Sequence, residues 1–499
     1  MNTKLNGEIA RLIEYAERYL GLNERDELYI RNRLLDILGQ NAYEKPAASA
    51  AIPALPDEIL GGIFAALDEE GREYDRATLG EKLMDAVMLK PSEHEKEFLS
   101  RYACSPQEGT AWAYEYAVKS DYVKKSAIDK NLKWTSKNGK LEITINLSKP
   151  EKNNKDLQKQ LTQASADYPK CTICRENEGF ERVGFSRRNM RTLSLTLNGE
   201  DWFWQYSPYA YFNEHGIAIS CKHTPMVLNG DTVEHLFDFV DMFPHYFIGN
   251  NAPLPRVGGS ILMHNHYQGG GYVLPMQRAG ARFCLTSRSH PAVKCCVVDW
   301  YNTALRFEGK DRKEIAALAE EVFTAWKEYE NAALDILPYT GSEPHNTASC
   351  IARKTDGGYI LDLILRNNRV SERYPDGIFH AHREYHAIKS ESIGLIEAMG
   401  LFILPARLKR QLGEIKEYLT GGRAYSPQTL AEDMKIFAPM IDRLTAGGKT
   451  SEKQAEDILR DEVELTCERI LDNTAVFKRD EAGENGLKEF LKSCGLQIK

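Results

Sequence analysis

The chain has 499 residues, of which 42% are hydrophobic and 27% charged, so its composition is that of a globular protein and excludes wholesale disorder. A length of this kind allows two or three domains, and a formal net charge of -8 argues against a generic nucleic-acid-binding surface, which would be basic. No window reaches the roughly 18 apolar residues of a membrane span. The ten cysteines come without a secretory signal or a disulfide framework, so we expect reduced thiols, a cytoplasmic location and no membrane partner.

Helical spacing of apolar residues dominates the first third of the chain. Residues 1–22 mix charged and apolar residues as an amphipathic helix does, whereas a signal peptide has an unbroken apolar stretch. Residues 47–56 form an Ala/Pro linker, after which Asp57 is the expected N-cap of a new helix. The alternating run 141–147 predicts one strand, and residues 148–159 predict an exposed connection.

The middle of the chain changes to short aromatic and β-branched runs. Residues 192–197 and 202–206 flank Asn198-Gly199, a pair of turn formers that predicts a hairpin, and residues 216–221 predict a further strand. Helices are expected over 232–243, 310–336, 393–421 and 430–471, and strands over 359–365 and 377–382. The pattern indicates an α+β protein in which antiparallel strands prevail.

The twelve histidines are not placed uniformly, and two pairs have the spacing His-x-His: His264 with His266, and His380 with His382. Alternate residues of a strand point to one face, so each pair can converge on one ion or one phosphate. The first pair lies in the glycine-rich run 258–271, where backbone N–H groups can approach phosphate oxygens. A histidine there can act as a nucleophile toward phosphorus or as a general base. A glycine-rich turn with two incidental histidines is the alternative.

His264, His266 and Gln268 together resemble the HxHxQ signature of the galactose-1-phosphate uridylyltransferases, a branch of the histidine-triad superfamily. Further resemblances lie in the CxxC of residues 171–174 and in residues 219–225, 339–345 and 379–382. The long flanking helices resemble the bacterial second type of this transferase. The resemblance implies an α+β fold with a histidine-triad-like antiparallel sheet core in two related halves, and with additional N- and C-terminal helical segments.

Four regions are expected on this basis: an N-terminal helical region (1–165), a catalytic half with HxHxQ and CxxC (166–305), a second half with HxH (306–425) and a C-terminal helical region (426–499). The resemblance implies transfer of UMP from UDP-glucose to galactose-1-phosphate in the Leloir pathway of galactose metabolism. His266 would attack the α-phosphorus and form a covalent uridylyl-histidine. Gln268 would stand where related hydrolases have histidine. A homodimer with these two substrates as partners, and no nucleic acid, is the corresponding expectation.

The His266 ring must present an unprotonated nitrogen to phosphorus, and a backbone carbonyl near His264 is expected to fix that tautomer by accepting from the other nitrogen. The amide of Gln268 can donate a hydrogen bond to a non-bridging phosphoryl oxygen but cannot act as an acid. The glutamine is therefore expected to support transfer while slowing hydrolysis of the intermediate.

Two metal sites are implied by the same resemblance. The first is a Cys₂His₂ set suited to a tetrahedral, structural Zn²⁺: Cys171, Cys174, His223 and His264. Free thiols or a redox pair are the alternative. The second is an iron-type site, for Fe²⁺ or a similar ion: His345, His380 and His382. The family places a carboxylate after HxHxQ, but residues 271–279 hold neither Asp nor Glu, so histidines bonded within a core or a phosphate pocket are the alternative here.

Four polar residues resemble substrate contacts of the family: Asn251, Ser260, Lys389 and Glu397. The first two resemble groups around the ribose and phosphate, and the last two resemble the segment that grips the sugar. Charges on a solvent-facing helix are the alternative for that second pair. Four aromatic residues are expected in core and hairpin packing, with a platform for the uracil ring as the alternative that one of them could also serve: Trp202, Trp204, Tyr206 and Tyr209.

Two other functions stay open from the sequence. An ADP-sugar phosphorylase or a dinucleoside polyphosphate phosphorylase of the same superfamily can use the same glutamine, although the extra helical flanks favour the uridylyltransferase. A zinc-stabilised binding protein that has lost catalysis is the other possibility, and the intact His266 and Gln268 argue against it.

Overall fold

The computed structural model describes residues 3–46, 50–148, 168–181, 187–259 and 261–499. The chain divides into two compact units, each assembled from segments that are separate in sequence. The first comprises Met1–Asp129, Gln163–Thr224 and His264–Gly271, and the second comprises Lys130–Thr162, Pro225–Met263 and Tyr272–Lys499. Among the described residues, no helix is both long and apolar enough to span a membrane. All but the first residue of the expected connection 148–159 lies outside the described ranges.

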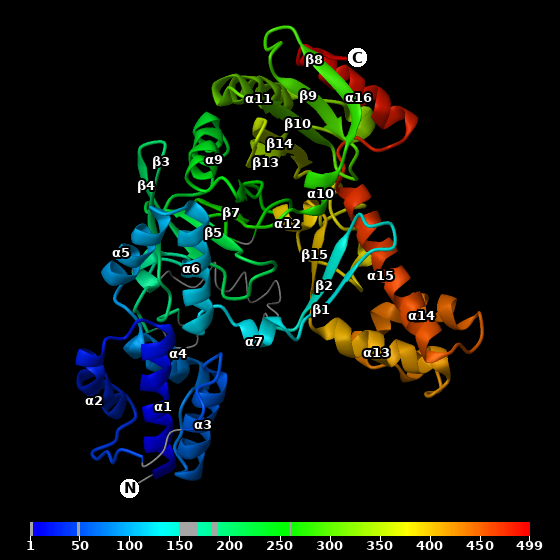
Figure 1. Ribbon diagram of the computed structural model, residues 1–499. Helices are drawn as coiled ribbons and strands as arrows, with labels where there is room; N and C mark the ends of the chain where they lie inside the picture. The colour runs from blue at the N-terminus through cyan, green and yellow to red at the C-terminus, as the bar shows by residue number, and fades with distance from the viewer. Residues whose placement is uncertain (1–2, 47–49, 149–167, 182–186, 260) are drawn as a thin grey trace. The chain divides into compact units, whose positions relative to one another are not determined.

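Helices form the N-terminal part of the first unit: α1 (Thr3–Tyr19), α2 (Glu27–Ile37), α3 (Asp57–Glu69), α4 (Arg76–Val87), α5 (Pro91–Tyr102), α6 (Pro106–Lys119) and α7 (Lys125–Ile128). The apolar stripe of α1 contains Leu5, Ile9, Leu12 and Ala16, which are fully buried because residues three and four apart share one helix face. α1 packs against α2 and α3 (Figure 1). The predicted amphipathic helix is confirmed, and Asp57 is the first residue of α3 rather than its N-cap.

An antiparallel sheet completes the first unit, with strand order β7-β5-β4-β3. Its strands are β3 (Leu193–Leu197), β4 (Glu200–Tyr206), β5 (Gly216–Ser220) and β7 (His266–Gly270). The predicted hairpin between β3 and β4 is confirmed. Asn198 and Gly199 have φ of 47° and 73°, the two positive values that a tight hairpin turn requires.

A larger antiparallel sheet forms the centre of the second unit, in the order β16-β8-β9-β10-β14-β13-β6. Its strands are β6 (Phe247–Gly249), β8 (Ala281–Ser287), β9 (Lys294–Val298), β10 (Ala304–Gly309), β13 (Asn346–Thr355), β14 (Gly358–Asn367) and β16 (Leu496–Ile498). Helices α9 (Gly230–Met242) and α11 (Arg312–Glu328) pack on it. The α11 residues Ile315, Leu318 and Val322 have no exposed surface, as expected for an apolar stripe facing a sheet.

The rest of the second unit contains smaller sheets and further helices. Strand β2 (Glu142–Asn146), which the alternating run predicted, lies between β1 (Leu132–Thr135) and β15 (Leu401–Pro405), and β11 (Tyr339–Thr340) pairs with β12 (Glu343–Pro344). The other helices are α10 (Pro275–Arg278), α12 (Leu395–Ala398), α13 (Arg407–Thr420), α14 (Ala438–Thr445), α15 (Glu452–Thr474) and α16 (Glu481–Ser493). α15 packs along α13 (Figure 1). The structure is thus α+β with mainly antiparallel sheets and helices at both ends, as predicted, and the pairing of β15 with β2 is a parallel exception among the described strands.

Four sequence predictions of elements are wrong, and one of them is the helix expected over 430–471, which residues 446–451 divide between α14 and α15. Residues 377–382 form no strand, because Gly377 has φ of 129° and the following side chains bond to nearby carbonyls. The helix expected over 393–421 is interrupted by β15, whose apolar residues pair in parallel with β2. A short apolar run is compatible with either structure, so periodicity alone could not separate them. Helix α11 ends at Glu328, well before the expected end at Ile336.

Candidate functional site

Strand β7 places His266 and Gln268 on one face of the first unit's sheet. Both pair with the apolar strand β5, which sets their register. Alternate residues share a face of a strand, and Tyr267 between them points to the other face. There its ring stacks on the buried Trp202, with 4.8 Å between the centroids. The core role predicted for Trp202 is confirmed, and His266 and Gln268 lie on the face opposite this packing.

The His266 ring has a defined tautomer. Its Nδ1 lies 2.7 Å from the main-chain oxygen of His264, and a carbonyl oxygen can only accept, so Nδ1 carries the proton and Nε2 does not. Burial lowers the pKa of His266 to about 4, although the hydrogen bond to His264 opposes that change. The ring is therefore neutral near pH 7, and Nε2 offers a lone pair. The predicted carbonyl near His264 is confirmed.

A further histidine, which the sequence analysis did not single out, lies beside Gln268. The Nε2 of His215 is 3.4 Å from Gln268 Oε1, and the residue is buried in the turn before β5. In the sequence, His215 stands eight residues before His223, and this spacing matches no motif. Only the pairing of β5 with β7, which brings this turn next to the glutamine, identifies it.

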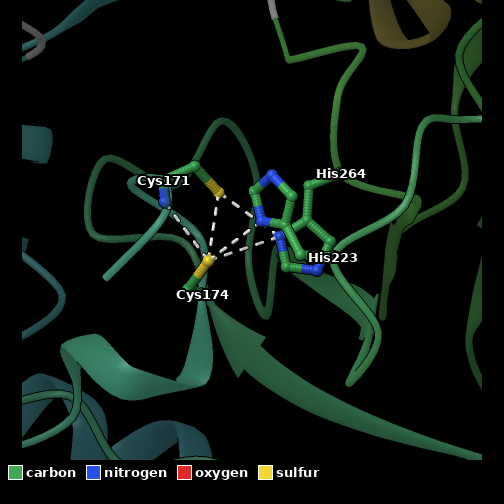
Figure 2. A group of neighbouring side chains, drawn as sticks. All are labelled: Cys171, Cys174, His223 and His264. Atoms are coloured by element: carbon green, nitrogen blue, oxygen red, sulfur yellow. Dashed lines mark hydrogen bonds between the residues drawn. The ribbon is translucent and has the colours of Figure 1, made fainter. Parts of the chain in front are cut away.

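The four residues of the predicted Cys₂His₂ set converge, and Figure 2 shows their side chains pointing toward one another. Cys171 Sγ lies 3.4 Å from Cys174 Sγ and 3.3 Å from His264 Nδ1, and Cys174 Sγ lies 3.3 Å from His223 Nδ1. With bonds of about 2.0–2.3 Å to a central ion, a tetrahedral site has ligand–ligand edges of about 3.3–3.8 Å. The cluster can therefore hold one tetrahedral metal ion.

Hydrogen bonds around the cluster orient its ligands. His264 Nε2 donates to the Ser220 carbonyl at 2.8 Å, which leaves Nδ1 unprotonated and directed at the thiols. Asn177 Nδ2 donates to the carbonyls of both Cys171 and Cys174, at 2.9 and 2.8 Å, and so fixes the CxxC turn. The hydrogen bond between the thiols lowers the pKa of Cys171 to about 7 and, together with burial, raises that of Cys174 to about 12, so Cys171 is the member of the pair that ionises more readily.

Comparison with known proteins decides the family. A family model described as galactose-1-phosphate uridyl transferase, N-terminal domain, matches residues 21–225, and the corresponding C-terminal domain matches residues 238–424. The chain belongs to the galactose-1-phosphate uridylyltransferase family. It is accordingly an enzyme of the nucleotidyltransferase class.

Relatives that carry this family name match the chain from end to end. The relative from Fusobacterium nucleatum is 38% identical, and the match covers 98% of this chain and 98% of the relative. The relative from Clostridium acetobutylicum is 39% identical, and the match covers 98% of this chain and 99% of the relative. One from Streptococcus pneumoniae is 37% identical over 99% of this chain and 100% of its own length. Among solved structures, yeast Ap4A phosphorylase covers 64% of this chain at 9% identity with a TM-score of 0.31, a likeness too low to bear on function.

The second histidine set, for which the family resemblance implied iron, is not brought together in the same way. His345 Nε2 bonds to Thr340 Oγ1, while His380 Nδ1 and His382 Nε2 bond to the carbonyls of Ala381 and Ile378. His382 also stacks on Tyr374. Within the described ranges, three or more potential ligands close enough to share an ion occur only at Cys171, Cys174, His223 and His264.

The residues that resemble the family's substrate contacts are buried in the second unit, apart from Ser260, which lies outside the described residues. Asn251 Oδ1 accepts from the Leu395 N–H at 2.9 Å. Lys389 Nζ and Glu397 Oε1 form an ion pair at 2.7 Å, with side chains 8% and 9% exposed. The alternative of solvent-facing helix charges is therefore wrong for this pair. A buried pair of opposite charges can orient a polar ligand, because either member can also bond to a hydroxyl.

Proposed function

We propose that the chain transfers a uridylyl group from UDP-glucose to galactose-1-phosphate, with His266 as the covalent carrier. The observation that carries the proposal is the buried, neutral His266 ring, whose Nδ1–H is held by the His264 carbonyl. That bond leaves Nε2 as the nucleophile, which is what attack on phosphorus requires. The family membership of the whole chain supports the same reaction class.

The reaction proceeds in two displacements at the same phosphorus. His266 Nε2 attacks the α-phosphorus of UDP-glucose, a P–N bond forms, and the P–O bond to glucose-1-phosphate breaks. The ring becomes positively charged, and the carbonyl of His264 stabilises that charge through the Nδ1–H. A phosphate oxygen of galactose-1-phosphate then attacks the phosphorus, UDP-galactose leaves, and the neutral ring returns. Gln268, on the same face, donates its amide to a non-bridging oxygen during both steps.

We further propose that the Cys₂His₂ cluster holds a structural Zn²⁺. The donor set, two thiolates and two imidazoles at tetrahedral distances, is the one that Zn²⁺ prefers. His264 links this cluster to the nucleophile, because its ring is a ligand while its main-chain oxygen orients His266. A bound ion would fix the segment that carries that carbonyl, and its role there would be structural.

An acceptor panel tests the proposed reaction. The protein is incubated with UDP-glucose and either galactose-1-phosphate or orthophosphate, and the nucleotide products are separated by chromatography. The proposal predicts UDP-galactose with the first acceptor and no accelerated release of UDP with the second. Rapid UDP formation with orthophosphate would instead identify a phosphorylase.

Location and assembly remain proposals as well. All ten cysteines are free thiols, including several exposed ones, which supports a reducing compartment such as the cytoplasm. The homodimer implied by the family resemblance is a prediction that multi-angle light scattering would check, with a molar mass near twice that of the chain as the expected result.

A further inference from the structure

His215 lies in the turn between β4 and β5 and faces Gln268. The ring is 3% exposed and stacks on Tyr211, with 4.9 Å between the centroids and 21° between the planes. The main-chain oxygen of His215 accepts from the Ser207 N–H at 2.8 Å. Stacking and backbone bonding therefore fix the position of the ring independently of any substrate.

The hydrogen bonds of the His215 ring define which nitrogen is protonated. The Tyr211 N–H points at Nδ1, with 3.4 Å between the nitrogens, and a backbone N–H can only donate. Nδ1 is therefore an acceptor, and the proton of the neutral ring is on Nε2. Since Nε2 lies 3.4 Å from Gln268 Oε1, the ring donates to the amide oxygen. A carboxamide held by its oxygen turns its NH₂ group to the opposite side.

We propose that His215 is a positioning residue that sets the orientation of the Gln268 carboxamide. The inference rests on the proposed function, in which the Gln268 NH₂ donates to a non-bridging oxygen of the uridylyl phosphate. In the opposite orientation the amide oxygen would face that anionic oxygen, and the contact would be repulsive. A preoriented donor contributes more to the transition state than one that must rotate during the reaction.

The glycine-rich run after His266 allows the turn to come close enough. Gly270 has φ of 146°, and a Cβ at this position would lie 2.2 Å from the main-chain oxygen of Glu214. Glu214 itself has φ of 58°, in the left-handed region, which folds the turn back toward β7. Because Gly270 has no side chain, the turn can lie close to β7. This close contact places His215 beside Gln268.

Two substitutions at His215 separate its hydrogen bond from its shape. His215→Phe keeps a flat ring for stacking but removes the donor, whereas His215→Gln keeps an N–H donor at a similar distance from the backbone. In single-turnover labelling of His266 by UDP-glucose, we expect His215→Phe to slow uridylylation by about 10–100-fold, as loss of an outer hydrogen-bond partner does. The Kd for UDP-glucose should stay unchanged, and His215→Gln should regain most of the rate.

A matched control and a second background make the test specific. His94→Phe changes another buried histidine of the first unit whose ring contacts aromatic side chains, and it should label at the wild-type rate. In a Gln268→Leu background, His215→Phe should cause no further loss, because the group it positions is gone. Equal losses in both backgrounds, or a His215→Phe protein at full rate, would overturn the inference. Failure of the wild-type protein to label would instead overturn the proposed function, and this inference with it.

Discussion

At the scale of single residues, burial and one hydrogen bond decide the state of the His266 ring. Burial lowers its pKa to about 4 against the opposing effect of the His264 carbonyl, and that carbonyl accepts from Nδ1–H, so Nε2 stays unprotonated throughout the neutral range. We predict that His266→Ala abolishes turnover, because no other side chain supplies an in-line nitrogen. A steady-state assay checks this. Retention of a tenth of the wild-type kcat, a loss of only about 1.4 kcal/mol in the barrier, would contradict the assignment.

Gln268 offers a test of transfer against hydrolysis. A histidine at this position could donate a proton and assist water, whereas glutamine can only bind the phosphoryl oxygen. We therefore predict that Gln268→His raises the ratio of UDP-glucose hydrolysis, measured without acceptor, to uridylyl transfer, measured with galactose-1-phosphate. If that ratio is unchanged or lower, Gln268 does not protect the intermediate.

Metal analysis and a substitution at Cys171 test the proposed structural metal site. We predict about one Zn²⁺ per chain by elemental analysis of protein purified without added metal. Cys171→Ser should lower the Tm by more than about 5 °C, since loss of a metal ligand removes binding energy from the folded state, while KM changes little. Cys104→Ser, an exposed thiol of the same unit, is the control and should keep the wild-type Tm. If the native protein has the same Tm without metal as with it, the structural role of the metal is refuted.

At the scale of elements, a histidine connects the end of strand β8 to helix α11. His290 Nδ1 and Nε2 lie 2.7 and 3.1 Å from carboxylate oxygens of Glu314 and Glu321, both on α11. Burial opposes the charged ring, but the bonds to the two carboxylates outweigh it and raise the pKa of His290. The imidazolium therefore bridges the strand end and the helix at pH values below this raised pKa.

The sign of the pH dependence follows from that raised pKa. The contribution to stability is complete below the ordinary histidine pKa of about 6.5 and is lost as pH rises through the raised value. We predict that His290→Phe destabilises the protein more at pH 5.5 than at pH 9. The effect should be below about 1 kcal/mol because both carboxylates are half exposed. Urea unfolding at the two pH values measures it, and an equal effect at both would contradict the ion pair.

Sequence patterns predicted those elements in which local chemistry agrees with the final packing. Helix α1 and the hairpin at Asn198 follow from apolar spacing and turn chemistry, and both form as expected. β15 was missed because its apolar run has no local sign of strand, and only its pairing with β2 makes it one. His380 and His382 have strand-like spacing but lie in a loop, where nearby carbonyls satisfy their rings.

The residues of the candidate site also differ in whether the sequence alone reveals them. His264 and His266 lie two positions apart in the sequence, so their motif could be recognised directly. His215 lies 53 residues before Gln268 and meets it only because β5 and β7 pair, so no linear pattern reveals it. The family resemblance identified the segment that contains Lys389 and Glu397. It could not show that the two residues form a buried ion pair, because burial depends on tertiary packing.

At the scale of the whole molecule, each compact unit is built from segments far apart in the chain. The short stretch His264–Gly271 belongs to the first unit, although the residues on both sides of it belong to the second. That stretch carries His264 of the Cys/His cluster, the proposed nucleophile His266 and Gln268, and it pairs with β5. The proposed chemistry thus depends on a long-range assembly of the first unit.

The central claim is that His266 carries the uridylyl group. The most direct measurement is mass spectrometry of the protein after incubation with UDP-glucose alone, followed by peptide mapping under conditions that preserve phosphoramidates. We predict a mass increase of one uridylyl group per chain, located on His266 and removed by galactose-1-phosphate with formation of UDP-galactose. A protein that turns over both substrates without any such adduct, or that carries the group on another residue, would contradict the account.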